Sequence, residues 1–169
     1  IYHRMGDSDK ALEYYNKSLE VKLRLNNKKG IAHTYNNIAK VHNSKGKHEL
    51  ANEFYKKSLL IKEEINDKEG IASAHNNIGR TYLRINNIER AKYHIDLGLE
   101  LSRNLNNLDL LTSSYSTSAR LYRIMNNFEK AYRYQVKLNI LEDSLREIQN
   151  KRAVIEAEAK YNFERREQD

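Results

Sequence analysis

Apolar residues recur along this chain at helical spacing, in stretches that polar segments separate. Residues 31–45 place apolar side chains three and four positions apart, which predicts an amphipathic helix: Ile31, Tyr35, Ile38, Ala39 and His42. After Gly46 another apolar stripe predicts a second helix: Leu50, Ala51, Phe54, Tyr55, Ser58, Leu59 and Ile61. The polar residues 66–70 predict a loop that ends this unit.

The same unit returns every 40 residues, in columns that keep their residue type. The clearest columns are Ala11, Ala51, Ala91 and Ala131; Tyr2, His42, Tyr82 and Tyr122; Gly6, Gly46, Asn86 and Asn126; and Ile31, Ile71 and Leu111. Glycine and asparagine readily adopt the left-handed conformation that closes a helix, so the third column predicts a turn. A fixed period of this size indicates stacked repeats at 31–70, 71–110 and 111–150, after a partial repeat at 1–30.

The order of large, small and aromatic residues in each unit resembles the tetratricopeptide repeat family, in its 40-residue variety. The motif reads Tyr35, Ala39, His42, Ala51, Tyr55 and Ser58, then His75, Gly79, Tyr82, Ala91, Ile95 and Gly98. The resemblance covers residues 1–145 and implies an all-α fold, a right-handed α-solenoid of helix-turn-helix repeats. Gln135 and Leu138 depart from the motif, which predicts that the last repeat is a capping one. Residues 146–169 are expected to form a C-terminal capping or linker helix.

The distribution of charge changes the meaning of the net charge of +7. The windows 1–5, 31–45, 71–85 and 111–125, which hold the first helix of each repeat, contain seven basic residues and no acidic one. The other 23 basic residues balance the 23 acidic ones. The family resemblance implies that these first helices line the concave surface, so we expect a basic groove that concentrates positive potential. The alternative is that acidic residues merely gather on the outer helices for solubility.

The polar stripe of the first helices supplies the candidate binding residues. They are Asn36, Asn37, Lys40, Asn76, Asn77, Arg80, Arg84, Thr117, Arg120 and Arg123. Kinesin light chain and bacterial Rap-type regulators, which the stripe resembles, use asparagines to hold a peptide backbone, and this implies the same role for Asn37 and Asn77. An amide both donates and accepts hydrogen bonds, while the cations would select acidic side chains or a free C-terminal carboxylate. The alternative is that the mid-helix asparagines tie neighbouring helices together.

The sequence offers little support for catalysis. No histidines have helical metal-ligand spacing, no glycine-rich phosphate loop is present, and the chain has no cysteine, so we expect neither an enzyme nor a cofactor nor a metal site. A nucleic-acid-binding groove is a further alternative, but most tyrosines fall in predicted core columns and are not free to stack on bases. Another alternative function is a module that assembles with other copies of the chain. No apolar run approaches the roughly 20 residues of a membrane span.

After Ser144 the turn residues stop, and apolar side chains continue near a three-to-four spacing that Arg152 interrupts: Leu141, Leu145, Ile148, Ile155 and Ala159. This predicts one long helix that caps the solenoid or enters a coiled coil. Residues 156–169 resemble the segment that follows tetratricopeptide repeats in bacterial sensor histidine kinases and related regulators. That resemblance implies a role in signal transduction and a downstream output domain in the same chain. It also implies an extracytoplasmic sensor region, with a cytoplasmic one as the alternative.

Overall fold

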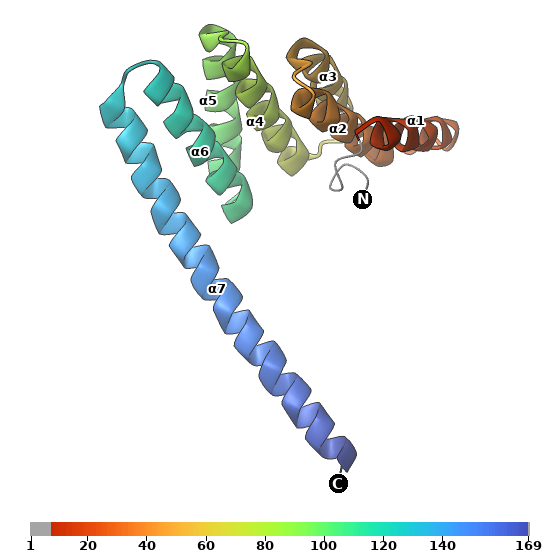
Figure 1. Cartoon of the computed structure of the whole chain (residues 1–169), viewed down its shortest axis with the longest axis vertical. Coiled ribbons are helices and arrows are strands. Elements are labelled where there is room, and N and C mark those ends of the chain that lie inside the picture. The colour runs from red at the N-terminus through yellow and green to blue at the C-terminus, as the bar shows by residue number, and fades with distance from the viewer. Residues whose placement is uncertain (1–7, 169) are drawn as a thin grey trace.

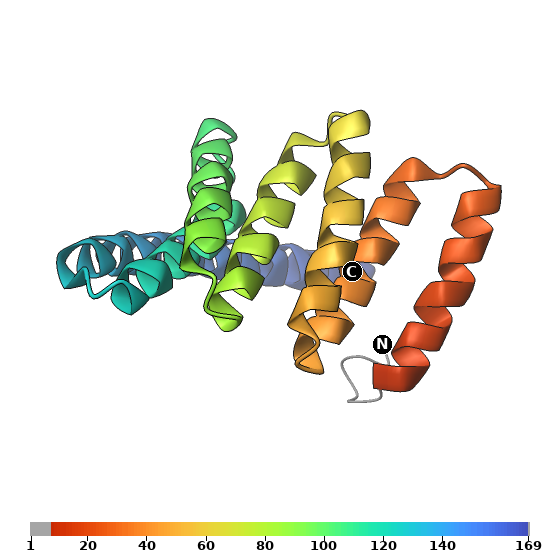
Figure 2. The same ribbon diagram turned by 90° about the horizontal axis from the view of Figure 1, so that it is seen from above.

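The computed structural model describes residues 8–168 and contains seven helices and no β-strand in that range. The helices are α1 (Ser8–Arg24), α2 (Lys28–Ser44), α3 (His48–Glu64), α4 (Lys68–Arg84), α5 (Ile88–Asn104), α6 (Leu108–Ile124) and α7 (Phe128–Gln168). Successive helices are antiparallel neighbours, and each pair stacks on the next (Figures 1 and 2). The predicted all-α solenoid of helix-turn-helix repeats is confirmed.

The turns between helices explain why asparagine occurs in pairs. The first residue of each pair takes the left-handed conformation after a helix, as Asn86 does with φ 56° and Asn126 with φ 55°. Gly46 does the same with φ 74°, so the predicted turn column is confirmed there, while Gly6 lies outside the described residues. The second residue caps the next helix: Asn107 Oδ1 accepts the backbone N–H of Leu110 at 3.1 Å. One dipeptide therefore ends one helix and starts another.

These caps make the loops shorter than the sequence pattern predicts. Asp67 caps α4 through the backbone N–H of Gly70, so Lys68–Gly70 form the first turn of α4 and the predicted loop at 66–70 is wrong beyond Asp67. The first turns of α4 and α6 thereby gain Glu69 and Asp109. The expectation that these helices carry no acidic residue is therefore wrong, since each helix begins earlier than the sequence pattern predicts. A carboxylate is favourable there because it lies beside the positive end of the helix dipole.

An aromatic trio packs each pair of helices together. The ring of Phe54 on α3 lies 5.9 Å from Tyr35 and 5.5 Å from His42, both on α2. Positions 40 and 80 residues later repeat this contact as His94 with His75 and Tyr82, and as Tyr134 with Tyr115 and Tyr122. His42 and His75 thus occupy aromatic positions between paired helices, and the column of Phe54, His94 and Tyr134 that faces them was not predicted.

Helix α7 combines the second helix of the last repeat with the tail. It runs without a break from Phe128 to Gln168, and the predicted division after residue 145 falls within it. Its first part packs on α6, and its C-terminal half extends away from the solenoid (Figure 1). None of the described helices combines the length and the apolar character that crossing a bilayer requires.

Candidate functional site

Three hollows adjoin one another on the face formed by α2, α4 and α6. We call them the α2 hollow (about 480 Å³), the middle hollow (about 280 Å³) and the α6 hollow (about 680 Å³). Lys40 lines both the α2 and the middle hollow, Arg80 lines both the middle and the α6 hollow, and Asp109 lines both the α2 and the α6 hollow. Because neighbouring hollows share these side chains, we treat the three as one continuous groove.

Five of the predicted cations line this groove. Arg84 lines the middle hollow, and Arg120 and Arg123 line the α6 hollow, beside the shared Lys40 and Arg80. Within residues 8–168, none of these five side chains forms an ion pair, so their charges have no protein counterion at bonding distance. A guanidinium in this condition can form a two-pronged hydrogen bond with an incoming carboxylate.

The asparagines act mainly between helices. Asn77 donates to Asn36 Oδ1 at 3.2 Å, which joins α4 to α2, and its own Oδ1 accepts from Arg80 at 2.8 Å. Asn76 is 2% exposed and donates to the Ser114 hydroxyl on α6 at 2.7 Å. These contacts match the alternative interpretation, in which the mid-helix asparagines tie neighbouring helices together.

The remaining predicted polar residues differ in their access to the groove. Asn36 is half-buried and lines the α2 hollow, while Asn37 lines none of the three hollows. Thr117 lines the α6 hollow but is 5% exposed, and its hydroxyl donates to the Ser113 carbonyl. Asn76 is enclosed between α4, α5 and α6, so we leave it out of the site proposed below.

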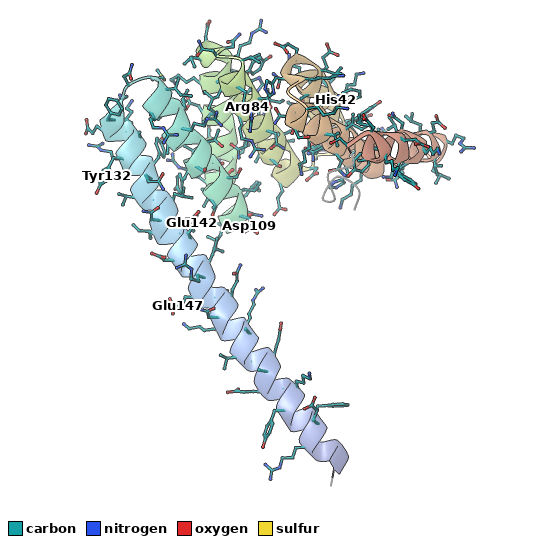
Figure 3. All side chains as sticks on the ribbon, viewed as in Figure 1. His42, Arg84, Asp109, Tyr132, Glu142 and Glu147 are labelled. Carbon is teal, nitrogen blue, oxygen red and sulfur yellow. The ribbon has the colours of Figure 1, made fainter. Side chains whose placement is uncertain are left out.

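The groove also contains acidic and aromatic groups that the sequence pattern did not single out. Asp109 at the start of α6 and Glu142 on α7 both line the α6 hollow, together with Tyr132, which is 71% exposed (Figure 3). Asp67 and Glu69 line the α2 hollow. The sequence could have indicated Asp67 and Asp109, because acidic residues are common at the start of a helix. It could not have indicated Glu142, which reaches the hollow only because α7 continues past it.

Tyr55 is a further residue that the sequence placed only in the core. Its side chain is 1% exposed, yet it lines the middle hollow, and its buried hydroxyl makes no hydrogen bond of ordinary distance and angle among the described residues. Burial raises the pKa of the Tyr55 phenol, while the positive charge of Arg80, a side-chain hydrogen bond with Arg80 and the charge of Arg84 oppose that rise.

Lys62 is a buried cation at the floor of the α2 hollow. It is 4% exposed, and its ammonium donates to the Gly70 carbonyl at 3.2 Å. Burial lowers the pKa of Lys62, while Asp67 raises it. The part of the chain that the structure describes holds no group of three or more His, Asp or Glu side chains arranged for a metal ion.

A comparison with protein families matches the chain to the tetratricopeptide repeat over residues 1–64 and again over 30–104. A search of curated protein sequences finds no match. Solved structures show the same fold. The apo form of RapI superposes with a TM-score of 0.80 at 24% identity, over 86% of this chain and 53% of its own.

Two other solved structures are similar in the same way. BtubC from P. vanneervenii gives a TM-score of 0.76 at 22% identity, covering 86% of this chain and 60% of that protein. A Rap protein complexed with competence and sporulation factor gives 0.58 at 18% identity, covering 86% and 50%. The chain thus spans about half the length of the proteins that it resembles.

Proposed function

Because this chain belongs to the tetratricopeptide repeat family, whose repeats form protein-interaction scaffolds, we propose that it is a non-catalytic module that binds an extended peptide segment in its groove. We propose further that the groove selects acidic side chains or a free C-terminal carboxylate. The observation that carries this is a run of five cations that form no ion pair with the described residues: Lys40, Arg80, Arg84, Arg120 and Arg123. An anionic ligand would satisfy charges that the fold leaves unpaired.

The hydrogen bonds around Arg80 support a prearranged site. Asn77 holds the Arg80 guanidinium at 2.8 Å and is itself bonded to Asn36 on the neighbouring helix. The side chain therefore loses less rotational freedom when a ligand binds than an unsupported arginine would. In this proposal the asparagines position the cation, and Asn36 in the α2 hollow is the one that also contacts the peptide backbone.

The groove is not uniformly basic, and this shapes the proposed ligand. Asp109 and Glu142 stand in the α6 hollow beside Arg120 and Arg123. A ligand with acidic residues at the middle hollow and a basic or neutral residue at these carboxylates fits the charges better than a uniformly acidic one. The same carboxylates would repel the phosphates of a nucleic acid, which places that alternative behind a peptide.

A peptide library varied in acidity tests this proposal. We expect acidic members to bind the wild-type chain, and Arg80→Gln to weaken the binding of the best members by about tenfold, since a hydrogen-bonded ion pair is lost. Arg103→Gln is the matched control, because Arg103 is an exposed arginine on α5 that lines none of the hollows. Fluorescence anisotropy measures all three proteins. Equal binding of acidic and neutral peptides would contradict the proposal.

We propose a signalling context for this module on a separate resemblance, that of residues 156–169 to the connectors of bacterial sensor kinases. In that setting residues 1–145 would bind the partner, and 146–169 would link them to an output domain. The continuity of α7 supports this role, because one helix runs from the α6 hollow, at Glu142, to Gln168. A ligand that contacts α7 could thereby change the orientation of its distal half.

A second candidate function is self-association through α7. Its distal half carries exposed apolar side chains. Leu141, Ile148 and Ile155 recur every seven residues, and Leu145 and Ala159 each follow one of these positions by four residues. Two parallel copies would bury this seam, and Lys151 of one copy would lie opposite Glu156 of the other. In proteins most helical stability comes from tertiary packing, which also favours a partner for the exposed distal half of α7.

Light scattering across a concentration series tests self-association. We expect the wild-type mass to rise towards that of a dimer, and Ile155→Lys to remain monomeric because it places a charge in the seam. Val154→Lys is the control, since Val154 is similarly exposed, at 56% against 63% for Ile155, but lies off the seam. A wild-type chain that stays monomeric at every concentration would exclude this candidate.

A further inference from the structure

The amine of Lys62 is a buried group that the proposed peptide binding does not use. The residue belongs to the last turn of α3, is 4% exposed and lines the α2 hollow. A Cβ on Gly70 would lie 2.9 Å from its Cδ, so the lysine stem passes directly over the first turn of α4. Among the described residues its Nζ makes one hydrogen bond, to the Gly70 carbonyl at 3.2 Å. Because an ammonium carries three N–H donors, the fold pairs this one incompletely.

Lys22 occupies the equivalent position in the preceding repeat and shows what Lys62 lacks. Its stem passes in the same way over Gly30, where a Cβ would lie 3.0 Å from the lysine Cδ. Its Nζ donates to the hydroxyl of Thr34 at 2.7 Å, whereas the residue 40 positions after Thr34 is Ala74, which has no hydroxyl. Lys22 also lines none of the three hollows. Lys62 therefore differs from it in weaker hydrogen bonding and in its access to a hollow.

The charges around Lys62 favour its neutral form. Lys40 on α2 lines the same hollow, and neither lysine forms an ion pair with the described carboxylates, although Asp67, Glu69 and Asp109 line the hollow as well. Burial lowers the pKa of Lys62, Asp67 raises it, and the positive charge of Lys40 lowers it. A lysine amine without its proton is a nucleophile. The hollow of about 480 Å³ gives a small electrophile room to approach it.

We propose that Lys62 is a modification site that carbon dioxide carboxylates reversibly to a carbamate. The lone pair of the neutral Nζ attacks the carbon of carbon dioxide, a new N–C bond forms, and one C–O π pair moves onto oxygen. The nitrogen then releases a proton to water, so the product is an N-carboxylate and no oxidant or reductant takes part. The carbamate N–H keeps its acceptor at Gly70, and the new oxygens pair with the ammonium of Lys40.

The charges of the hollow favour carbon dioxide over other electrophiles. It is uncharged, so neither the cations nor the carboxylates of the lining repel it. Its adduct is an anion, which turns the repulsion between Lys62 and Lys40 into an attraction. An acyl group or an aldehyde would leave a neutral amide or an imine, and Lys40 would still have no counterion.

The test traps the carbamate on the whole chain. The protein is equilibrated at neutral pH with isotope-labelled bicarbonate as the source of carbon dioxide, and triethyloxonium ion then converts the carbamate into an ethyl ester that survives digestion and mass spectrometry. We expect the labelled group on Lys62 and not on Lys22 in the same sample. We expect Lys40→Met to lower the occupancy of Lys62 roughly fivefold, because the carbamate loses its counterion.

Two controls accompany this measurement. Lys47→Met removes an exposed lysine that lines none of the hollows, so its occupancy should match that of the wild type. An added peptide with a free α-amino group shows that the trapping reaction works. The comparison between Lys62 and Lys22 is made within the wild-type chain, so the folding of a variant does not enter it.

Three results would overturn the proposal. The first is the absence of label on Lys62 while the added peptide is labelled. The second is equal labelling of Lys62, Lys22 and the exposed lysines, which would mean that amines react without a particular site. The third is an unchanged occupancy in Lys40→Met, which contradicts the ion pair that stabilises the carbamate. None of these results depends on whether the groove binds a peptide.

Discussion

Gly79→Ala is expected to lower the free energy of unfolding by about 2 kcal/mol, although alanine is the better helix former by about 1 kcal/mol. A Cβ at Gly79 on α4 would lie 2.6 Å from Cγ1 of Ile95 and 3.2 Å from the backbone oxygen of Ala91, both on α5. Contacts this short force the two helices apart, and Ile95 and Ala91 are fully buried, so the neighbouring groups cannot move into solvent. Urea titration followed by circular dichroism measures the change.

The equivalent positions in the other repeats suggest a second substitution that should restore part of the lost stability. The equivalent positions hold Ala39 with Tyr55, and Ala119 with Gln135, so alanine occurs where the facing residue is not branched at Cβ. We expect Ile95→Leu to recover about 1 kcal/mol of the loss when combined with Gly79→Ala, because it moves the methyl branch away from the new Cβ. If Gly79→Ala instead stabilises the protein, helix propensity outweighs the clash and the proposed helix contact is wrong.

The contact between Gly79 and Ile95 also shows how much of the fold the sequence could predict. A column of small residues with 40-residue spacing was sufficient to predict closely packed helix pairs and the turns between them, because period and residue size are properties of the sequence itself. The choice between glycine and alanine in one repeat was not predictable. It depends on a contact between Gly79 and Ile95, and only the spacing of α4 and α5 reveals how short that contact is.

The candidate site was predictable in its cations and less so in its other groups. Lys40, Arg80 and Arg120 recur every 40 residues, and the family resemblance implied that the helices carrying them line a common groove. The asparagines were ambiguous, because an amide can bond to a ligand or to a neighbouring helix, and the structure gives Asn76 and Asn77 helix partners. Direct contact between these asparagines and a peptide backbone stays a prediction.

The sequence pattern could not predict which side chains of α3 and α7 line the groove. The sequence pattern identifies Tyr55 as a core aromatic, which its ring is, but no pattern along α3 shows that its side chain lines a hollow between α2 and α4. Glu142 enters the α6 hollow from α7 for a similar reason. Both depend on how helices from different parts of the chain cross. A one-dimensional pattern records which side of a helix is polar but not what faces it.

The pair of His75 and His94 gives the protein a predicted sensitivity to acid. Their Nδ1 atoms lie 2.9 Å apart between α4 and α5, so one imidazole donates to the other, and the accepting ring must be neutral. Burial, the charge of protonated His75 and the charge of Lys56 lower the pKa of His94 to about 4, and burial lowers the pKa of His75. The rings of Tyr82 and Tyr93 cover His94 as well.

The sign of the effect follows from these directions. An unfolded histidine has a pKa near 6.5, so between pH 6.5 and 4 the unfolded chain binds protons that the folded chain does not. Stability contributed by the neutral pair is therefore complete above pH 6.5 and is lost as the pH falls towards 4. With allowance for partial solvent screening, we expect a loss of about 2 kcal/mol between pH 7 and pH 4.

A variant that copies the first full repeat isolates this loss from the titration of carboxylates. His75→Tyr with His94→Phe recreates the contact that Tyr35 makes with Phe54 at the equivalent positions, so the rings should still pack. Urea titrations at pH 7 and pH 4 should show that this double variant loses about 2 kcal/mol less than the wild type on acidification. His33→Gln removes an exposed histidine instead and should follow the wild type. Equal acid losses in the wild type and the double variant would mean that the buried pair does not govern acid stability.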